Sequence, residues 1–273
     1  MKTGFSTVAC GALPYRDVLA AARRAGMAEV EIRLDNRNRP FGLSPAEVPA
    51  LAAACREAGV TVSDLGSGIT LTGDAPDKCR EAETLFATAQ TLGARGVRVF
   101  LGNFSATRPG YDRGDYPGIV RSLRRMCDAA DAFGVGVWVE THNAYSTGTV
   151  LKKLLTDTDR TALSVIWDVM HPYEMGESPT VTARCLAGHI AHVHIKDGVP
   201  KADPDAASFL YTRLGEGTVP VRDALAALAA VGYDGTLSLE WEAAWRPELA
   251  GIYPSLNDLL TAYTRYLSTL GVR

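Results

Sequence analysis

The chain has 273 residues, of which 47% are hydrophobic and 22% are charged, and its 28 basic and 31 acidic side chains give a formal net charge of −3. This composition is typical of a folded globular protein and excludes a chain that is mainly disordered. The mild acidic excess argues against a nucleic-acid groove, which needs a basic stripe to neutralise phosphates. No window approaches the roughly 18 uninterrupted apolar residues of a membrane helix, so we expect no nucleic-acid partner and no membrane partner.

The cysteines and the first residues of the chain bear on its location. An odd, dispersed set of thiols without a C-x-x-C pair is typical of reduced cysteines rather than of a disulfide framework. The five are Cys10, Cys55, Cys79, Cys127 and Cys185. The residues from Met1 to Asp17 contain no sustained apolar stretch of the kind that a secretory signal peptide has. The sequence therefore predicts a cytoplasmic protein.

Eight short runs rich in β-branched residues are predicted to be buried strands. In chain order they are Phe5–Cys10, Ala28–Arg33, Thr61–Leu65, Gly96–Leu101, Gly136–Glu140, Ser164–Val169, Ile190–Ile195 and Thr236–Trp241. Stretches with apolar residues three and four positions apart lie between them and are predicted to be helices. Examples are Tyr15–Arg24, Pro45–Ala58, Asp77–Leu92, Tyr116–Phe133, Val221–Ala230 and Ser255–Leu270.

An alternation of strand and helix that repeats eight times within 273 residues predicts a (β/α)8 TIM barrel of the α/β class. A doubly wound open sheet is the structural alternative, but no G-x-G-x-x-G motif follows the first strand. No Pro/Ser-rich linker or compositional break divides the chain, so we expect one domain over residues 1–273. In such barrels the chemistry lies at the C-terminal ends of the strands.

Four consecutive predicted strands carry a polar side chain as their last or next-to-last residue. These strand-end residues are Glu140, Asp168, His194 and Glu240. A carboxylate at the end of an apolar strand is costly unless it is paired or bound to a cation, so a buried ion pair or a helix cap would explain any one of them. All four on adjacent strands favour a divalent metal ion. Three carboxylates and one imidazole suit Mn²⁺ best, with Mg²⁺ or Co²⁺ as alternatives, whereas Zn²⁺ more often recruits another His or Cys.

Several short motifs surround the strand-end residues. They are Val139-Glu140-Thr141-His142, Trp167-Asp168 with His171, His192-Val193-His194-Ile195-Lys196-Asp197, Leu214-Gly215-Glu216-Gly217 and Leu239-Glu240. Over nearly the whole chain, the sequence resembles the sugar phosphate isomerase/epimerase family, the xylose-isomerase-like barrels that include ketose 3-epimerases and hydroxypyruvate isomerase. The resemblance implies a metal ion held by the four strand-end residues, an acid/base pair made of Glu140 and Glu240, and a substrate-binding role for His171.

Two positions depart from the pattern of the ketose 3-epimerases. Those enzymes carry a second Glu six residues after the first metal-binding Glu, and an Arg six residues after the metal-binding His. This chain has Ser146 and Pro200 at these places. Because both residues help to hold the sugar in those enzymes, the resemblance supports a metal centre more strongly than a ketohexose substrate. The same superfamily also contains dehydratases that act on inososes or dehydroshikimate.

The residue types themselves suit one kind of reaction. Isomerising or epimerising a hydroxy-ketone requires removal of a proton beside a carbonyl, and a divalent ion stabilises the enediolate that develops. Two carboxylates on opposite faces of the substrate, here Glu140 and Glu240, can remove and return that proton. We therefore expect an isomerase or epimerase of a sugar, sugar derivative or cyclitol. The alternatives are a dehydratase that expels a β-hydroxyl from the same enolate, with Lys196 or His171 as the acid, and a non-catalytic ligand-binding barrel.

Four further polar residues are candidates for contact with the substrate. His142 lies two residues after Glu140 and hence on the same face, where it either contacts substrate or caps the loop. Lys196 either pairs with a strand-end carboxylate or polarises a substrate oxygen, and Arg33 either neutralises buried carboxylates or binds a substrate anion. Glu242 either binds a hydroxyl or balances a nearby arginine. We expect a small carbohydrate-like substrate, and the sequence leaves room for a homo-oligomer.

Three other features have a structural and a functional interpretation. Gly215-Glu216-Gly217 is either a tight loop before a helix or, through its backbone N–H groups, an anion site. His192 lies one layer deeper on the inward face of its strand, so we expect it to support or pack against the site. The tryptophans beside the strand-end residues, Trp138, Trp167 and Trp241, are expected to point outward into the helix layer.

Overall fold

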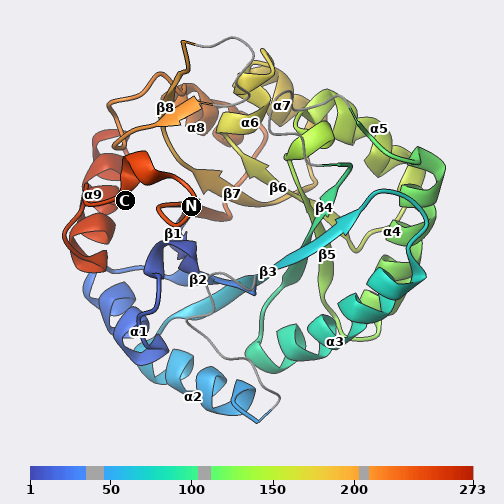
Figure 1. Ribbon diagram of the computed structural model, residues 1–273, viewed down its shortest axis with the longest axis horizontal. Coiled ribbons are helices and arrows are strands. Elements are labelled where there is room, and N and C mark those ends of the chain that lie inside the picture. Colours follow the sequence, from blue (N-terminus) through green and yellow to red (C-terminus); the bar gives the residue numbers. More distant parts are fainter. Residues whose placement is uncertain (35–45, 104–111, 203–208, 273) are drawn as a thin grey trace.

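Eight parallel strands close into a barrel that is surrounded by helices (Figure 1). The structure, a computed structural model, describes residues 1–34, 46–103, 112–202 and 209–272. The barrel strands are β1 (Lys2–Ser6), β2 (Glu29–Arg33), β3 (Thr61–Leu71), β4 (Gly96–Leu101), β5 (Gly136–Glu140), β6 (Leu163–Asp168), β7 (Ile190–Ile195) and β10 (Thr236–Leu239). Around the barrel they follow the order β1-β10-β7-β6-β5-β4-β3-β2, which confirms the predicted TIM barrel.

The first strand is shorter than its apolar sequence predicts. The bounds of β4, β5 and β7 agree with the prediction, but the expected strand Phe5–Cys10 is wrong because β1 ends at Ser6. Thr7–Cys10 forms a short 3-10 helix, η1, and the hydroxyl of Ser6 accepts a hydrogen bond of 3.4 Å from the backbone N–H of Val8. Apolar composition does not distinguish a buried strand from a buried helical turn, so the pattern could not place this boundary.

The ends of two other strands also differ from the prediction. β10 ends at Leu239 rather than at Trp241, so that Glu240 follows the strand while its N–H still donates to the carbonyl of Ile195 at 3.2 Å. β3 runs on to Leu71, with an irregular register against β4. β1 also begins at Lys2, three residues before the predicted Phe5. The remaining strand boundaries differ from the prediction by at most one residue, which is the ordinary uncertainty of an element's end.

The helices form the outer layer. They are α1 (Tyr15–Arg24), α2 (Val48–Ala58), α3 (Pro76–Leu92), α4 (Tyr116–Asp131), α5 (Gly148–Thr158), α6 (Met170–Glu174), α7 (Pro179–Leu186), α8 (Val221–Ala230) and α9 (Leu256–Thr269), with 3-10 helices η2 (Asn143–Tyr145) and η3 (Pro247–Leu249). The predicted first residue of the second helix, Pro45, lies outside the described residues. Of the helices in the described ranges, none combines the length and the apolar character needed to cross a membrane.

A small hairpin follows β7 and was not predicted. Its strands, β8 (Gly198–Pro200) and β9 (Phe209–Tyr211), pair in antiparallel fashion outside the barrel (Figure 1). Three residues are too few for a period of two to be recognised, so sequence patterns do not reveal such strands. The hairpin places the buried ring of Tyr211 with its centroid 5.4 Å from the Nζ atom of Lys196.

Alternation along the strands separates the hydrophobic core from a polar barrel interior. Val193 and Ile195 of β7 join the core, whereas His192 stacks on Trp138 with 6.1 Å between the ring centroids. The expectation that Trp138 points outward is therefore wrong. This tryptophan lies two residues before Glu140 and so shares the inward face of β5.

Candidate functional site

The four strand-end residues lie together at one mouth of the barrel. Glu140 and Asp168 end β5 and β6, His194 lies one residue before the end of β7, and Glu240 follows β10. One potential ligand atom of each residue lies within 4.8 Å of the other three, and all four side chains are buried. They meet because the carboxyl ends of adjacent parallel strands share one edge of the barrel.

The spacing within this cluster matches that of ligands around one ion. The Nδ1 atom of His194 lies 3.4 Å from Oε1 of Glu140 and 3.4 Å from Oε2 of Glu240. Two ligands bound about 2.1 Å from an ion lie roughly 3.0 Å apart at right angles and roughly 3.4 Å apart at the tetrahedral angle. This buried Nδ1 atom has no hydrogen-bond partner in the described part of the chain, which is unusual for a buried polar atom. The donor set therefore fits a divalent cation.

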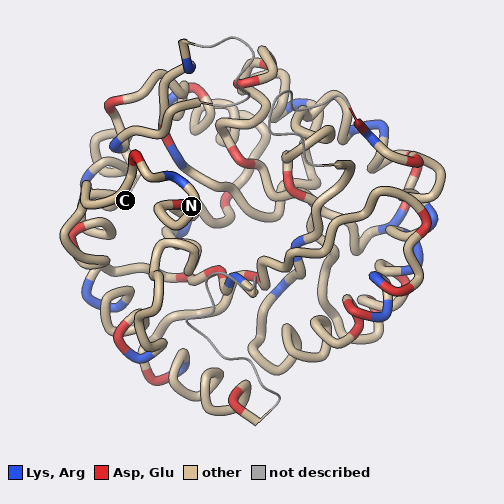
Figure 2. Tube along the Cα trace, in the orientation of Figure 1, with Lys and Arg blue, Asp and Glu red and all other residues tan. Residues whose placement is uncertain are grey.

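Lys196 lies among the carboxylates of this cluster. Its Nζ atom is 2.6 Å from Oδ2 of Asp168, 2.7 Å from Oε2 of Glu240 and 3.5 Å from Oε1 of Glu242. Burial lowers the pKa of the lysine, but these carboxylates outweigh burial and raise the pKa well above its ordinary value. The ammonium group is therefore charged, and it pairs with two of the four strand-end residues at once. Figure 2 shows acidic and basic positions side by side in the interior of the barrel.

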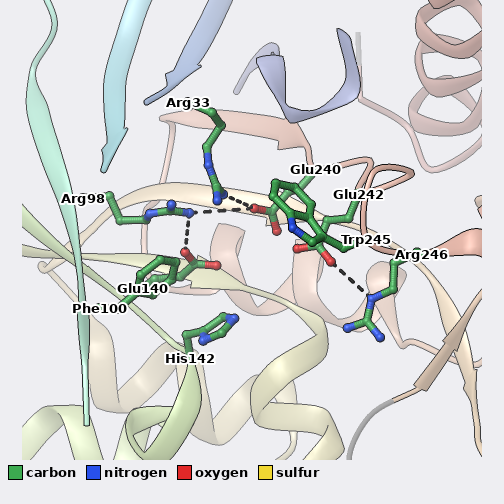
Figure 3. A pocket seen from close by; sticks show the side chains of 9 residues that line it. All are labelled: Arg33, Arg98, Phe100, Glu140, His142, Glu240, Glu242, Trp245 and Arg246. Atoms are coloured by element: carbon green, nitrogen blue, oxygen red, sulfur yellow. Dashed lines mark hydrogen bonds and ion pairs between the residues drawn. The ribbon is translucent and has the colours of Figure 1, made fainter. Parts of the chain in front are cut away.

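Two arginines on other strands form ion pairs with Glu140 and Glu240. The Nη1 atom of Arg33, at the end of β2, lies 3.1 Å from Oε1 of Glu240, and that of Arg98, on β4, lies 2.8 Å from Oε2 of Glu140 (Figure 3). Burial raises the pKa of Glu140, but Arg98 outweighs it and the pKa lies below its ordinary value. Burial also raises the pKa of Glu240, but Lys196 and His194 outweigh burial and hold this pKa well below its usual range. Both carboxylates are thus ionised, as a base or a metal ligand must be.

A cavity of about 460 Å³ opens onto these carboxylates, which is a size suited to a small molecule. Its lining residues are Arg33, Arg98, Phe100, Glu140, His142, Glu240, Glu242, Trp245 and Arg246 (Figure 3). The lining includes three of the five residues predicted to contact substrate. The other two lie behind it, Lys196 against Glu240 and His171 against the ring of His142, with 4.7 Å between the ring centroids.

The two histidines near the cavity have opposite charge states. Burial and the neighbouring His171 lower the pKa of His142 to about 4, so His142 is neutral near pH 7. Burial also lowers the pKa of His171, but Asp168 and Glu174 outweigh it and raise the pKa to about 9. The Nδ1 atom of His171 lies 3.0 Å from Oε2 of Glu174, and its Nε2 atom lies 3.6 Å from Oδ2 of Asp168. A charged donor and a neutral imidazole therefore lie side by side.

Glu31 is a buried residue that sequence analysis missed. It lies on β2, and its Oε2 atom is 2.7 Å from the Nε2 atom of His194. Burial raises the pKa of Glu31, but His194 outweighs burial and the pKa lies below its ordinary value. The signal was present, because a period of two places Glu31 on the same face as Arg33.

Two lining residues on a loop were also missed. Trp245 and Arg246 lie between β10 and η3, where only their position shortly after a strand end marks them as candidates. The Nε atom of Arg246 lies 3.4 Å from Oε2 of Glu242, and its Nη2 atom donates to the hydroxyl of Tyr211 at 3.3 Å. Arg246 is thus an arginine that balances Glu242, one of the two roles expected of that glutamate.

The backbone N–H groups of the glycine pair after the hairpin bind the carboxylate of Asp197. The N–H groups of Gly215 and Gly217 donate to Oδ2 of Asp197 at 2.8 and 3.0 Å. Those of Gly198 and Val219 donate to Oδ1 of the same residue at 2.8 and 3.2 Å. A Cβ atom on Gly217 would lie 2.1 Å from Oδ1 of Asp197, which explains why glycine is needed there. The structure therefore favours the tight-loop interpretation over an external anion.

Loss of this carboxylate should destabilise the fold. We expect Asp197→Ala to lower the free energy of unfolding by about 3 kcal/mol, because an unsatisfied buried donor costs roughly 1–3 kcal/mol. Denaturant unfolding monitored by circular dichroism measures the change. Glu216→Ala, at an exposed position of the same loop, is the matched control and should leave stability unchanged. Equal stability of the two variants would contradict the role given to Asp197.

Comparison with known proteins places the chain in a family. Residues 19–260 match the model of the xylose isomerase-like TIM barrel family, and the chain belongs to that family. The putative hydroxypyruvate isomerase of Streptomyces coelicolor is 25% identical in an alignment of 254 residues that covers 84% of this chain and 86% of that protein. The inosose dehydratase of Lacticaseibacillus casei is 25% identical over 148 residues. That match spans about half the length of either protein, 50% of each.

Two solved structures share the fold over the whole chain. A D-psicose 3-epimerase from Clostridium cellulolyticum H10 is 19% identical, with a TM-score of 0.78 and 99% of both chains covered. The IolI protein with a bound zinc atom is 17% identical, with a TM-score of 0.80 and 99% of this chain and 98% of that chain covered. The names of these relatives divide between isomerases or epimerases and a dehydratase.

Proposed function

We propose that this chain is a divalent-metal-dependent enzyme that isomerises or epimerises a small hydroxy-ketone, namely a sugar, a sugar derivative or a cyclitol. The observation that carries the proposal is the convergence of Glu140, Asp168, His194 and Glu240 within 4.8 Å, with Glu140 and Glu240 in the lining of a small-molecule cavity. The ion held by these four residues would act as a Lewis acid toward a developing enediolate. We assign Mn²⁺ to the site because oxygen ligands dominate it, with Mg²⁺ and Co²⁺ as alternatives.

The two glutamates have the properties of a proton-transfer pair. Each has one oxygen on a cation, Glu140 on Arg98 and Glu240 on Arg33, and the other oxygen faces His194. They extend from β5 and from the end of β10, and two strands, β6 and β7, lie between these around the barrel. One ionised carboxylate can take the proton from one face of the substrate, and the other, once protonated, can deliver a proton to the opposite face.

The remaining polar residues suit the binding of substrate oxygens. His171 is positively charged and can donate a hydrogen bond, while the neutral His142 can accept one or donate one. Arg33 and Glu242 line the cavity and can bind carbonyl and hydroxyl groups respectively. Lys196 lies between Asp168 and Glu240, where its charge opposes the effect of burial and favours the ionised form of both carboxylates. The cytoplasm remains the predicted location of this chemistry.

A dehydratase is the second candidate, and the match to inosose dehydratase favours it. Such an enzyme forms the same enolate and then expels a hydroxyl from the neighbouring carbon as water. The expulsion needs an acid, and two charged donors, His171 and Lys196, both lie close to Asp168. Both candidates thus use the same proton abstraction and differ in the step that follows.

A single labelling experiment separates the two reactions. The Mn²⁺-loaded protein is incubated in D₂O with a panel of ketoses, keto-cyclitols and oxo-glycosides, and the products are analysed by mass spectrometry. An isomerase or epimerase should leave the molecular formula unchanged and introduce deuterium beside the carbonyl, whereas a dehydratase should yield an enone that has lost one water. The EDTA-treated protein is the control and should do neither. A metal-loaded protein that changes no substrate and exchanges no proton would contradict both candidates.

A further inference from the structure

One contact beneath the candidate metal centre crosses the barrel and takes no part in the proposed reaction. The Nε2 atom of His194 on β7 lies 2.7 Å from Oε2 of Glu31 on β2, and both side chains are fully buried. Two strands, β10 and β1, separate β7 from β2 around the barrel, so the contact is not between neighbouring strands. An uncompensated buried carboxylate would be costly, which makes this pairing a specific feature of the interior.

The contact determines which nitrogen of His194 faces the carboxylate cluster. Glu31 takes the Nε2 side of the ring, and the Nδ1 side lies 3.4 Å from both Glu140 and Glu240. In a neutral imidazole one nitrogen carries the proton and the other carries the lone pair. A carboxylate that accepts a hydrogen bond from Nε2–H keeps the proton on Nε2. The lone pair is then on Nδ1, and this is the tautomer that binds a metal ion through Nδ1.

We propose that Glu31 is a positioning residue for the metal centre, which holds the His194 ring with its Nδ1 lone pair directed at the ion. The inference rests on the metal site of the proposed function but not on the reaction that the site performs. Glu31 is not among the residues that line the cavity, and this assignment gives it no contact with the substrate. It acts through His194, by fixing the tautomer and the orientation of the ring and by increasing the basicity of its ligating nitrogen.

A competing interpretation is that Glu31 itself binds a second ion. Potential ligand atoms of Glu31, His192 and His194 also lie within 4.8 Å of one another. Two ligands of one ion are roughly 3.0–3.4 Å apart, however, whereas the Oε2 to Nε2 distance of 2.7 Å is that of a short hydrogen bond. A second ion would also require His194 to lose both ring protons if Nδ1 bound the first. The geometry therefore favours a hydrogen bond.

Asp64 provides a matched control for Glu31. It is equally buried in the neighbouring strand β3, and its Oδ1 atom accepts a hydrogen bond of 2.6 Å from the hydroxyl of Ser63 rather than from His194. Burial and the nearby Glu31 raise the pKa of Asp64 to about 8, so this side chain is largely protonated at neutral pH. Asp64→Asn therefore removes an interior carboxyl group of similar burial and leaves both partners of the Glu31–His194 contact in place.

The test is the affinity of the metal-free protein for Mn²⁺, measured by isothermal titration calorimetry. Glu31→Gln keeps an acceptor but loses the charge, and we expect its Kd to rise by about 10-fold. Glu31→Ala loses the acceptor as well, and its Kd should rise by about 100-fold, the two ends of the range for such partners of ligating histidines. Asp64→Asn should keep the wild-type Kd. Circular dichroism of the metal-free variants tests whether each one folds. If Glu31→Ala does not fold, the comparison of Glu31→Gln with Asp64→Asn is sufficient.

Each other outcome has a distinct meaning. A wild-type Kd in Glu31→Gln and Glu31→Ala would overturn the positioning role and leave the metal centre standing. Two bound ions per wild-type chain, with one lost in Glu31→Gln, would also overturn the positioning role. They would assign a second ion to the cluster of Glu31, His192 and His194. A wild-type chain that binds no Mn²⁺, Mg²⁺ or Co²⁺ would contradict the metal centre of the proposed function and this inference with it.

Discussion

Turnover should fall by about 10²–10⁴-fold when either Glu140 or Glu240 is replaced by glutamine, the range for loss of a positioned acid or base. An amide cannot take up a proton, whereas both carboxylates are kept ionised by adjacent cations, Glu140 by Arg98 and Glu240 by Lys196 and Arg33. Steady-state kinetics on the substrate found in the labelling experiment measures the loss. In an epimerase, each variant should still exchange the α-proton of one epimer only, because the remaining carboxylate faces one side of the substrate.

Two controls keep this prediction interpretable. Glutamine retains an oxygen that can bind a metal ion, so metal content must be measured in each variant before turnover is compared. Glu216→Gln, at an exposed position, should have wild-type kinetics. A metal-loaded Glu240→Gln enzyme with near-wild-type turnover would make Glu240 a structural ligand, and would place the second proton on Lys196 or His171.

Removal of the metal ion should abolish activity and lower the melting temperature. An ion present at 100 times its Kd stabilises the folded state by about 2.7 kcal/mol, which corresponds to roughly 5–10 °C for a protein of this size. The metal-free barrel should nevertheless stay folded, since Lys196 pairs with Asp168 and Glu240 and offsets their mutual repulsion. Thermal unfolding in EDTA, followed by addition of Mn²⁺, Mg²⁺ or Co²⁺, measures both the loss and its recovery.

A ligand variant tests the same site without chelator. Asp168→Asn removes one anionic ligand, so its Kd for Mn²⁺ should rise and its melting temperature should respond less to added ion. Asp128→Asn, on the exposed side of α4, is the matched control and should behave as wild type. A metal-free protein with unchanged stability and full turnover would contradict a role for the ion.

The barrel and its strand-end residues were readable from local patterns. Strand and helix periods depend on the backbone of a few consecutive residues, so counting alternations was sufficient to predict the fold. The same local rule places Glu140 and Asp168 at the ends of β5 and β6, where parallel strands share an edge. It was less reliable where composition was ambiguous, as at Thr7–Cys10, where an apolar run forms a helical turn rather than a strand.

Contacts across the barrel were decided by the tertiary structure alone. That Glu31 meets His194, and that Lys196 lies between Asp168 and Glu240, depends on how the strands stagger around the closed sheet. Residues 163 positions apart, such as Glu31 and His194, share no local pattern that could report their distance. The sequence by itself therefore determined the order of strands and helices, the polar residues at or near the ends of four strands, and the chemistry that these residues suit. The closed barrel decided which charged side chains pair with each other, because only the stagger of the strands around the barrel brings side chains from non-neighbouring strands into contact.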